Sequence, residues 1–447
     1  MRNGTNRRTF LKGAGAALGG LAVPTNVVSA KTADKRYIVD LKSASEGVLD
    51  GLNVVHDLSQ IDLAVVEAEE TQVEGAAFSK DVEMEFDFAA AEDNGNGDEP
   101  GPRKLSQLQW DKQAQGVSQV HGRTRGEGTR VAVLDSGTIP DHPDLEHALN
   151  TDLSRNFTGD GGDYTPWYND HGTHVAGIIA GNDQNDEGVV GTAPGVELVA
   201  LRVFIGPFAF FGDIVAAMTY AGDIEADVAN MSLGTYPMPD NKENRELRET
   251  IERATDHAAS QGTLMVAAAG NDGTNLDADG DVLSLPNEAD NVMSVSATGP
   301  IGYRWDDKGN GKFIRNYHAA FNKLDEEPTE PAPYTNYGSE AIDISAPGGN
   351  EDPNAGSDTN AQYDMVLSTV FEWGDDGGMV PDHGWKAGTS MAAPQVSAAA
   401  ALVKSANPDA TPAEIREHLE STARDVGPAK YHGEGHLDIE AALNESI

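Results

Sequence analysis

The sequence contains no cysteine among its 447 residues. The protein therefore forms no disulfide bonds, and a cysteine protease and a thiolate-ligated zinc site are both excluded. Basic residues are also scarce, because 31 lysines and arginines stand against 73 aspartates and glutamates, for a formal net charge of −42. A surface this acidic repels phosphate backbones and anionic lipids, so we expect neither nucleic acid nor a membrane surface as a partner.

The acidic residues are spread along the whole chain and are not gathered in one tail. An ordinary acidic exported protein and a protein adapted to high salt both have such a composition. Salt screens the repulsion between like charges, so the second interpretation predicts that folding depends on salt. Hydrophobic residues make up 38% of the chain, which is enough for a sizeable core.

Long apolar runs are absent as well, and the nearest approach lies at the N-terminus. Arg7 and Arg8 precede a glycine- and alanine-rich stretch that ends near Val28. This stretch is too short and too rich in glycine for a membrane span, which needs about 20 apolar residues. Paired arginines, the apolar stretch and the small residues Ser29-Ala30 predict a twin-arginine-type signal peptide over 1–30, with a retained anchor as the alternative.

Residues 31–91 have short alternating apolar runs that predict strands, in a unit too small for a rich core of its own. Residues 92–108 begin with a run of aspartate, asparagine, glycine and proline, which is typical of an exposed linker. A small strand-rich unit, a linker and a large domain over 109–447 together predict an inhibitory propeptide with its processing region. An unrelated N-terminal binding module is the alternative.

Three short segments carry the candidate chemistry. Asp135 ends the apolar run 131–134, His171 and His174 lie in a glycine-rich helix start, and Ser390 opens an alanine-rich helix. Each signal is weak alone, because the aspartate suits a turn, the serine an N-cap, and the two histidines a metal pair or a buried structural position. No glutamate completes a His-Glu-x-x-His pattern, so we interpret His174 as a core histidine.

The order of the three segments is more specific than any one of them. Asp, His and Ser follow one another along the chain, whereas an α/β-hydrolase has the order Ser, acid, His. That fold also needs a Gly-x-Ser-x-Gly turn, and Ala392 occupies the position of its second glycine. The pattern therefore favours a serine protease of a different class.

The chain from about Gln109 to the C-terminus resembles the subtilisin family of serine proteases, the subtilases of peptidase family S8. Five ordered motifs carry the resemblance: 133–137 (VLDSG), 171–177 (HGTHVAG), 230–234 (NMSLG), 268–271 (AAGN) and 388–392 (GTSMA). The acidic surface, the arginine pair and the absence of cysteine are similar to the halolysins of halophilic archaea.

The resemblance implies a catalytic triad of Asp135, His171 and Ser390, with Asn271 as the side-chain donor of the oxyanion hole. It also implies substrate-binding segments, which are Ser232, Leu233, Gly234, Ala268, Ala269 and Gly270. The resemblance and the predicted signal peptide imply a secreted endopeptidase. Because the substrate-binding segments are small and uncharged, we expect broad specificity, with apolar or large residues at P1. Its partners would be protein and peptide substrates and its own propeptide, and we expect a monomer.

The resemblance further implies structural calcium, with no organic cofactor. The implied ligands are Asp144, the side chain of Asn185, and the backbone carbonyls of Asp183, Glu187 and Val189, since an all-oxygen set suits Ca²⁺. A merely solvated acidic loop is the alternative. Residues 302–333 are expected to be an insertion without a readable function.

Strand-like runs alternate with helical runs from residue 131 onward. This alternation predicts an α/β fold with a mostly parallel central sheet between two helical layers, preceded by a small α+β prodomain. A catalytically inactive, subtilase-like binding or chaperone protein is the alternative function, which an intact triad argues against.

Overall fold

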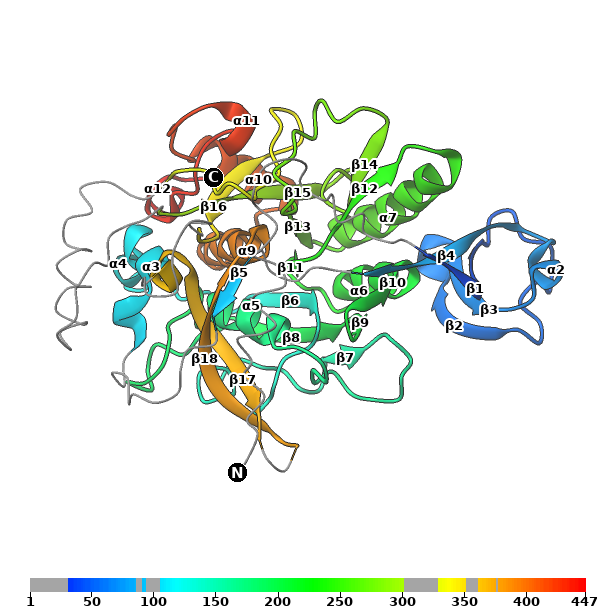
Figure 1. Cartoon of the computed structure of the whole chain (residues 1–447), viewed down its shortest axis with the longest axis horizontal. Helices are drawn as coiled ribbons and strands as arrows, with labels where there is room; N and C mark the ends of the chain where they lie inside the picture. Colours follow the sequence, from blue (N-terminus) through cyan, green and yellow to red (C-terminus); the bar gives the residue numbers. More distant parts are fainter. Residues whose placement is uncertain (1–30, 86–90, 94–104, 301–328, 351–360, 375–376) are drawn as a thin grey trace, which may run out of the picture.

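The computed structural model describes residues 31–85, 91–93, 105–300, 329–350, 361–374 and 377–447 (Figure 1). The expected signal peptide, most of the linker and most of the expected insertion at 302–333 lie outside the described residues.

A seven-stranded sheet forms the centre of the large domain (Figure 1). Its neighbouring strands are all paired in parallel. In spatial order the strands are β16 (Ile344–Pro347), β15 (Val292–Thr298), β13 (Leu264–Ala268), β11 (Val228–Met231), β6 (Arg130–Asp135), β8 (Glu197–Arg202) and β7 (Arg155–Asn156). The predicted parallel sheet is therefore confirmed.

Helices cover both faces of this sheet. Those that contribute most to the two cores are α5 (His171–Ala180), α6 (Phe211–Asp223), α7 (Lys242–Ser260) and α9 (Thr389–Ala406). Val131 and Val133 of β6 pack into the cluster that contains α5 and α9, whereas Ala132 and Leu134 pack into the one that contains α6 and α7. Successive residues of a strand point to opposite faces, so a continuous apolar run serves both cores. The predicted arrangement of one sheet between two helical layers is therefore confirmed.

Residues 31–85 form a separate antiparallel sheet beside α6 and α7 (Figure 1). Its strands are β1 (Lys31–Asp40), β2 (Asn53–Leu58), β3 (Leu63–Glu67) and β4 (Ala77–Glu85). Ile38 and Val65 pack into the cluster of α6 and α7, while Tyr37 and Val66 pack into a small cluster on the other face. This unit therefore buries one of its faces against the large domain.

Two short strands of the large domain continue this sheet. They are β9 (Phe204–Ile205) and β10 (Phe208–Phe210), and β10 pairs antiparallel with β4. The aromatic stretch 204–211 of the sequence thus pairs with the N-terminal unit through β10, although Phe208 stays 38% exposed.

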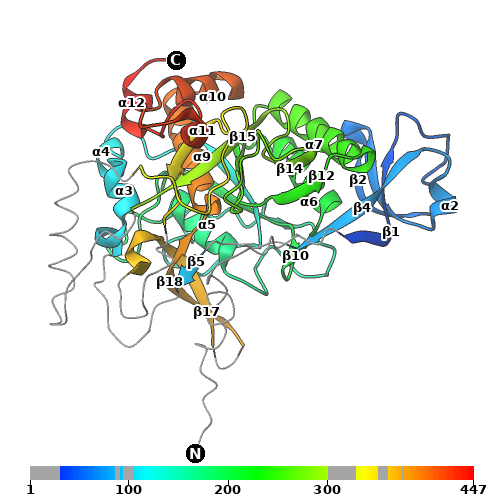
Figure 2. The same cartoon turned by 45° about the horizontal axis from the view of Figure 1, so that its top comes forward.

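A further sheet consists of the hairpin β17 (Val366–Trp373) and β18 (Met379–Ala387) together with β5 (Ala91–Asp93), as Figure 2 shows. The remaining elements are η1 (Ser59–Ile61), α2 (Glu70–Val73), η2 (Leu105–Leu108), α3 (Trp110–Ala114), α4 (Val117–Val120), β12 (Thr235–Pro239), β14 (Val282–Leu285), η3 (Ala361–Asp364), α10 (Pro412–Ser421), α11 (Ala429–His432) and α12 (Ile439–Asn444). Within the described residues, no helix combines the length and the apolar character that crossing a membrane requires.

Acid stability depends in part on a histidine buried in the large domain. His436 is 0% exposed, and its Nε2 lies 2.9 Å from the Thr298 hydroxyl. Burial lowers the pKa of His436 to about 3. Unfolded histidine binds a proton below about pH 6.5, so the unfolded state takes up the proton first and the free energy of unfolding falls as the pH decreases.

We expect this one group to remove about 2 kcal/mol of stability between pH 7 and pH 5. Urea unfolding curves of the Ser390→Ala chain at several pH values measure the effect, with His436→Gln in the same background as the comparison. The free energy of unfolding of His436→Gln should fall less steeply over this range. An identical pH dependence in the two proteins would contradict the assignment.

Candidate active site

The carboxyl ends of three adjacent parallel strands carry candidate site residues. Asp135 is the last residue of β6, Ser232 follows β11 directly, and Asn271 lies just beyond β13. Strand β11 pairs with both β6 and β13, so the three ends lie along one edge of the sheet. Sites of open α/β sheets form at this edge.

Asp135 and His171 form a buried pair. The His171 Nδ1 lies 2.9 and 3.0 Å from the two carboxylate oxygens of Asp135, and each residue is 1% exposed. A Cβ built on Gly172 would lie 2.4 Å from the Gly137 carbonyl oxygen and 3.1 Å from the Asp135 carboxylate. The second residue of α5 must therefore be glycine for the histidine to come this close to the strand end.

Ser390 lies in the first turn of α9 and is 5% exposed. Its hydroxyl donates to the Ser232 carbonyl at 3.2 Å, and the Ser232 hydroxyl donates to the Ser390 carbonyl at 2.7 Å. Asn230 donates to the same Ser232 hydroxyl at 2.9 Å and accepts from Ser397 at 2.9 Å. The start of α9 is thereby held against the end of β11.

The amide of Asn271 has a fixed orientation. Its Oδ1 accepts from both the backbone N–H and the hydroxyl of Thr389, each at 2.9 Å. The Thr389 hydroxyl oxygen in turn accepts from the Gly270 N–H at 3.1 Å. Because Oδ1 faces the residue before Ser390, the Nδ2 group points the other way and is available as a hydrogen-bond donor.

The predicted substrate-binding segments lie side by side. Met231 and Ala267 are partners in the register of β11 and β13, so the residues that follow these two strands run on in parallel. Gly270 has a φ of +99°, and a Cβ there would lie 2.4 Å from the Asn336 amide nitrogen. The wall that these segments form is therefore built from small residues and backbone.

His174 is a core histidine, as the sequence predicted. It is 0% exposed, and its Nε2 lies 3.2 Å from the carbonyl oxygens of both Val366 and Gly384. Burial lowers the pKa of His174 well below its usual value, so the ring is neutral. Its contacts tie α5 to the β17–β18 hairpin.

The residues expected to bind calcium do come together, but their contacts do not fit that ion. Asn185 Nδ2 donates to Asp144 Oδ1 at 2.6 Å, and the Val189 N–H donates to Asp144 Oδ2 at 2.9 Å. Asn185 Oδ1 instead accepts from the Glu187 N–H at 3.1 Å. A Cβ on Gly188 would lie 1.9 Å from Asp144 Oδ2, so the loop closes directly on the carboxylate.

The fifth expected ligand, Asp183, was expected to contribute its backbone carbonyl, and its side chain is used elsewhere. Its carboxylate pairs with the Arg125 guanidinium, whose Nε donates at 2.9 Å. A calcium site needs six to eight converging oxygens, whereas this loop presents hydrogen-bond donors to Asp144. The calcium site stays a prediction from the resemblance, and the contacts do not favour it.

Three features of the site could not be predicted from the sequence. The orienting role of Thr389 depends on a contact between segments 118 positions apart. The pairings of β4 with β10 and of β5 with β18 are also long-range, and β5 has only three residues.

A profile of the Subtilase family, Peptidase S8, matches residues 126–437. The chain belongs to the subtilase family. Subtilisin BL of Lederbergia lenta is 34% identical over 336 residues, which cover 73% of this chain and 97% of that protein. The halolysin-like extracellular serine protease Nep of Natrialba magadii is 30% identical over 98% of this chain and 73% of its own length.

Solved structures agree with this subtilase fold. The epidermin leader peptide processing serine protease of Staphylococcus aureus superposes with a TM-score of 0.70 over 92% of this chain and 98% of that chain, at 21% identity. The subtilase described here is thus a subtilisin-like serine protease, and its relatives include enzymes from halophilic organisms.

Proposed function

We propose that this subtilase is a secreted endopeptidase of broad specificity, made as a zymogen that cleaves its own N-terminal segment. The observation that carries the zymogen proposal is the path of that segment. Strand β4 ends at Glu85 on β10, and strand β5 begins at Ala91 on β18, which leads directly to Ser390. The described strands on either side of residues 86–90 thus pair with β10 and with the strand that leads to Ser390, which supports the proposal.

We assign the chemistry as follows. Ser390 Oγ attacks the peptide carbonyl carbon while His171 takes its proton, and His171 then protonates the leaving amine. Water releases the acyl group from Ser390 by the same route in reverse. Asp135 holds the imidazole through Nδ1 and stabilises its protonated form. Asn271 Nδ2 and the Ser390 N–H stabilise the oxyanion of the tetrahedral intermediate.

The N-terminal unit suits an inhibitory propeptide because its contact with the large domain includes a buried charge cluster. Arg36 pairs with Asp81 at 2.6 Å and also with Asp213 of α6, and both carboxylates are 0% exposed. Asp81 accepts from the Gly212 N–H at 2.9 Å, in the first turn of α6. Removing one member of the cluster would leave a buried charge without its partner, which is unfavourable. The cluster therefore favours docking of the N-terminal unit in this one position.

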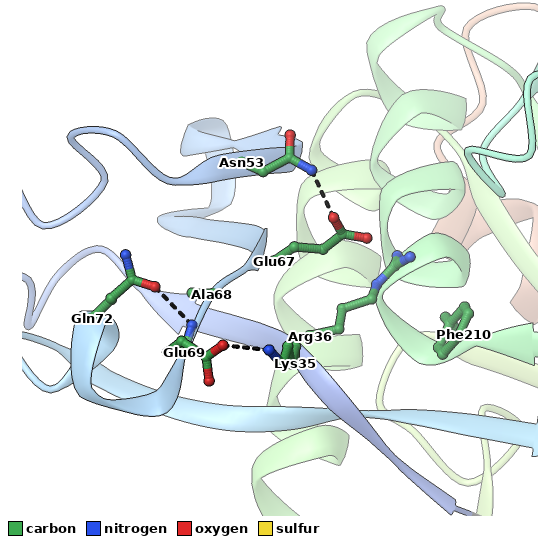
Figure 3. A pocket seen from close by; sticks show the side chains of 8 residues that line it. All are labelled: Lys35, Arg36, Asn53, Glu67, Ala68, Glu69, Gln72 and Phe210. Atoms are coloured by element: carbon green, nitrogen blue, oxygen red, sulfur yellow. Dashed lines mark hydrogen bonds and ion pairs between the residues drawn. The ribbon is translucent and has the colours of Figure 1, made fainter.

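A pocket between the propeptide and β10 shows how the two make contact. The Arg36 guanidinium lies 4.6 Å from the centre of the Phe210 ring, and Figure 3 shows Arg36 reaching from β1 toward Phe210. Nearby polar pairs stay within the propeptide, such as Asn53 with Glu67 at 2.7 Å. The contact thus covers β10, an edge that is freed when the propeptide leaves.

We infer broad specificity from the walls around the site. Backbone pairing along β10 and β18 grips an extended peptide regardless of its sequence. Ala268 and Ala269 are small and buried, and they offer no charge to a lysine or arginine at P1. Apolar or large P1 residues are therefore expected.

Export and salt adaptation also belong to this proposal. The arginine pair and apolar stretch of residues 1–30 support the twin-arginine route, and the net charge of −42 supports dependence on salt.

Mapping the mature N-terminus by mass spectrometry tests the zymogen proposal. We expect the first cut between Glu85 and Ala91, because the strands that flank this interval pair with β10 and with β18. Further trimming of residues 91–104 could follow, so samples are taken from the start of refolding. A first cut that falls inside β1–β4, or beyond residue 104, would contradict this path.

A further inference from the structure

A cluster of two histidines and one aspartate lies beside the loop that was expected to bind calcium. One ligand atom each from His142, Asp144 and His383 lies within 4.8 Å of the other two. His142 and Asp144 are 1% exposed, and the His383 side chain is 22% exposed. We propose that these three side chains form a binding site for a divalent transition metal, with Zn²⁺ as the best-matched ion.

The donor types decide between the metals. Imidazole nitrogens suit Zn²⁺ and its neighbours, whereas Ca²⁺ takes oxygen ligands almost exclusively. Two of the three donors here are imidazoles, and Asp144 supplies the one carboxylate. Two histidines and one carboxylate, with a water in the fourth position, form a known tetrahedral zinc arrangement. The exposed side of His383 leaves room for that water.

His142 is already arranged as a metal ligand would be. Its Nε2 lies 2.9 Å from the Asp382 carbonyl and donates to it, so Nδ1 carries the lone pair, which accepts from the Asp144 N–H at 3.1 Å. A metal-bound histidine usually donates its other N–H to a carbonyl or carboxylate in this way.

The remaining contacts show what the ion would replace. His383 Nε2 lies 2.7 Å from Asp144 Oδ2, and the Asp144 N–H faces His142 Nδ1 at 3.1 Å. A bound metal ion would replace these two hydrogen bonds, because it would bind the lone pairs that accept them on Asp144 Oδ2 and His142 Nδ1. Donor atoms of a tetrahedral zinc site lie about 3.4 Å apart, so the side chains need to move by about an ångström.

The position of the cluster gives the ion a structural role. His142 and Asp144 follow Asp135 along the chain, and His383 lies on β18, which leads to Ser390. A bound ion would tie these two segments together on the side of the site where β5 pairs. We therefore expect zinc to slow thermal unfolding without taking part in peptide hydrolysis.

The test uses the full Ser390→Ala chain, which removes self-cleavage and makes the result independent of the proposed activity. After chelator treatment, Zn²⁺ is titrated by calorimetry and Co²⁺ by visible absorption. We expect about one tight site and a tetrahedral cobalt spectrum. His383→Gln should weaken zinc binding at least 100-fold, while His147→Gln, a histidine outside the cluster, should leave it unchanged.

Calcium supplies the second arm, and millimolar Ca²⁺ should not displace the zinc. Zinc should also raise the melting temperature of the Ser390→Ala chain but not that of its His383→Gln derivative. Absence of tight zinc binding, or binding that persists in His383→Gln, would overturn the proposal. So would displacement of zinc by calcium.

Discussion

Replacing Ser390 by alanine is expected to abolish peptide hydrolysis and to leave the chain uncleaved between Glu85 and Ala91. Loss of the nucleophile removes the acyl-enzyme route altogether. The corresponding change in subtilisin costs about 10⁶-fold in kcat, and we expect a loss of that order here. Casein hydrolysis and the mass of the purified chain measure the two effects.

Ser405→Ala is the matched control, because Ser405 lies on the same helix and its hydroxyl bonds to the Glu127 carbonyl at 2.8 Å, away from the site. This variant should hydrolyse casein and mature like the unaltered protein. Continued self-cleavage in purified Ser390→Ala would show that another group carries the reaction.

Replacing Asn271 by alanine is expected to lower kcat by about 10²–10³-fold with little change in KM. The amide donor acts on charge that develops in the transition state, so its loss affects kcat more than substrate binding. That range comes from subtilisin, a protease of the same family. Steady-state kinetics on a short chromogenic peptide measure it.

The contact with Thr389 allows a finer comparison at the same position in the site. Thr389→Val removes one of the two donors that hold Asn271 Oδ1 and leaves only the Thr389 N–H, so the amide is held less firmly, whereas Thr389→Ser keeps the hydroxyl. We expect Thr389→Val to lower kcat and Thr389→Ser to retain most of it. If Asn271→Ala raised KM and left kcat intact, the result would contradict the oxyanion role.

The sequence was sufficient for the fold and for the pair at the centre of the site. Strand-length apolar runs are strong signals in a parallel sheet that is buried on both faces, and the run 131–134 predicted β6 in this way. The motif order then placed Asp135 next to His171, and the structure confirms their contact at 2.9 Å.

Contacts between distant segments could not be predicted. Gln395, in the helix of Ser390, accepts from Lys112 at 2.6 Å and donates to Asp111 at 2.7 Å, although nearly 300 positions separate them. His383 likewise has no local signal, because only the fold of the β17–β18 hairpin brings it to Asp144. Hydrophobic period and turn composition report local structure, and they carry no information on such pairs.

Labelling with a fluorophosphonate probe tests the central claim most directly, because the probe reacts with a serine only when a base activates it. We predict about one equivalent of label per mature chain, located on Ser390 by peptide mapping and absent from His171→Ala. Absence of labelling in a folded, mature chain would support an inactive binding protein instead. Label on any other residue would equally contradict the assignment of Ser390 as nucleophile.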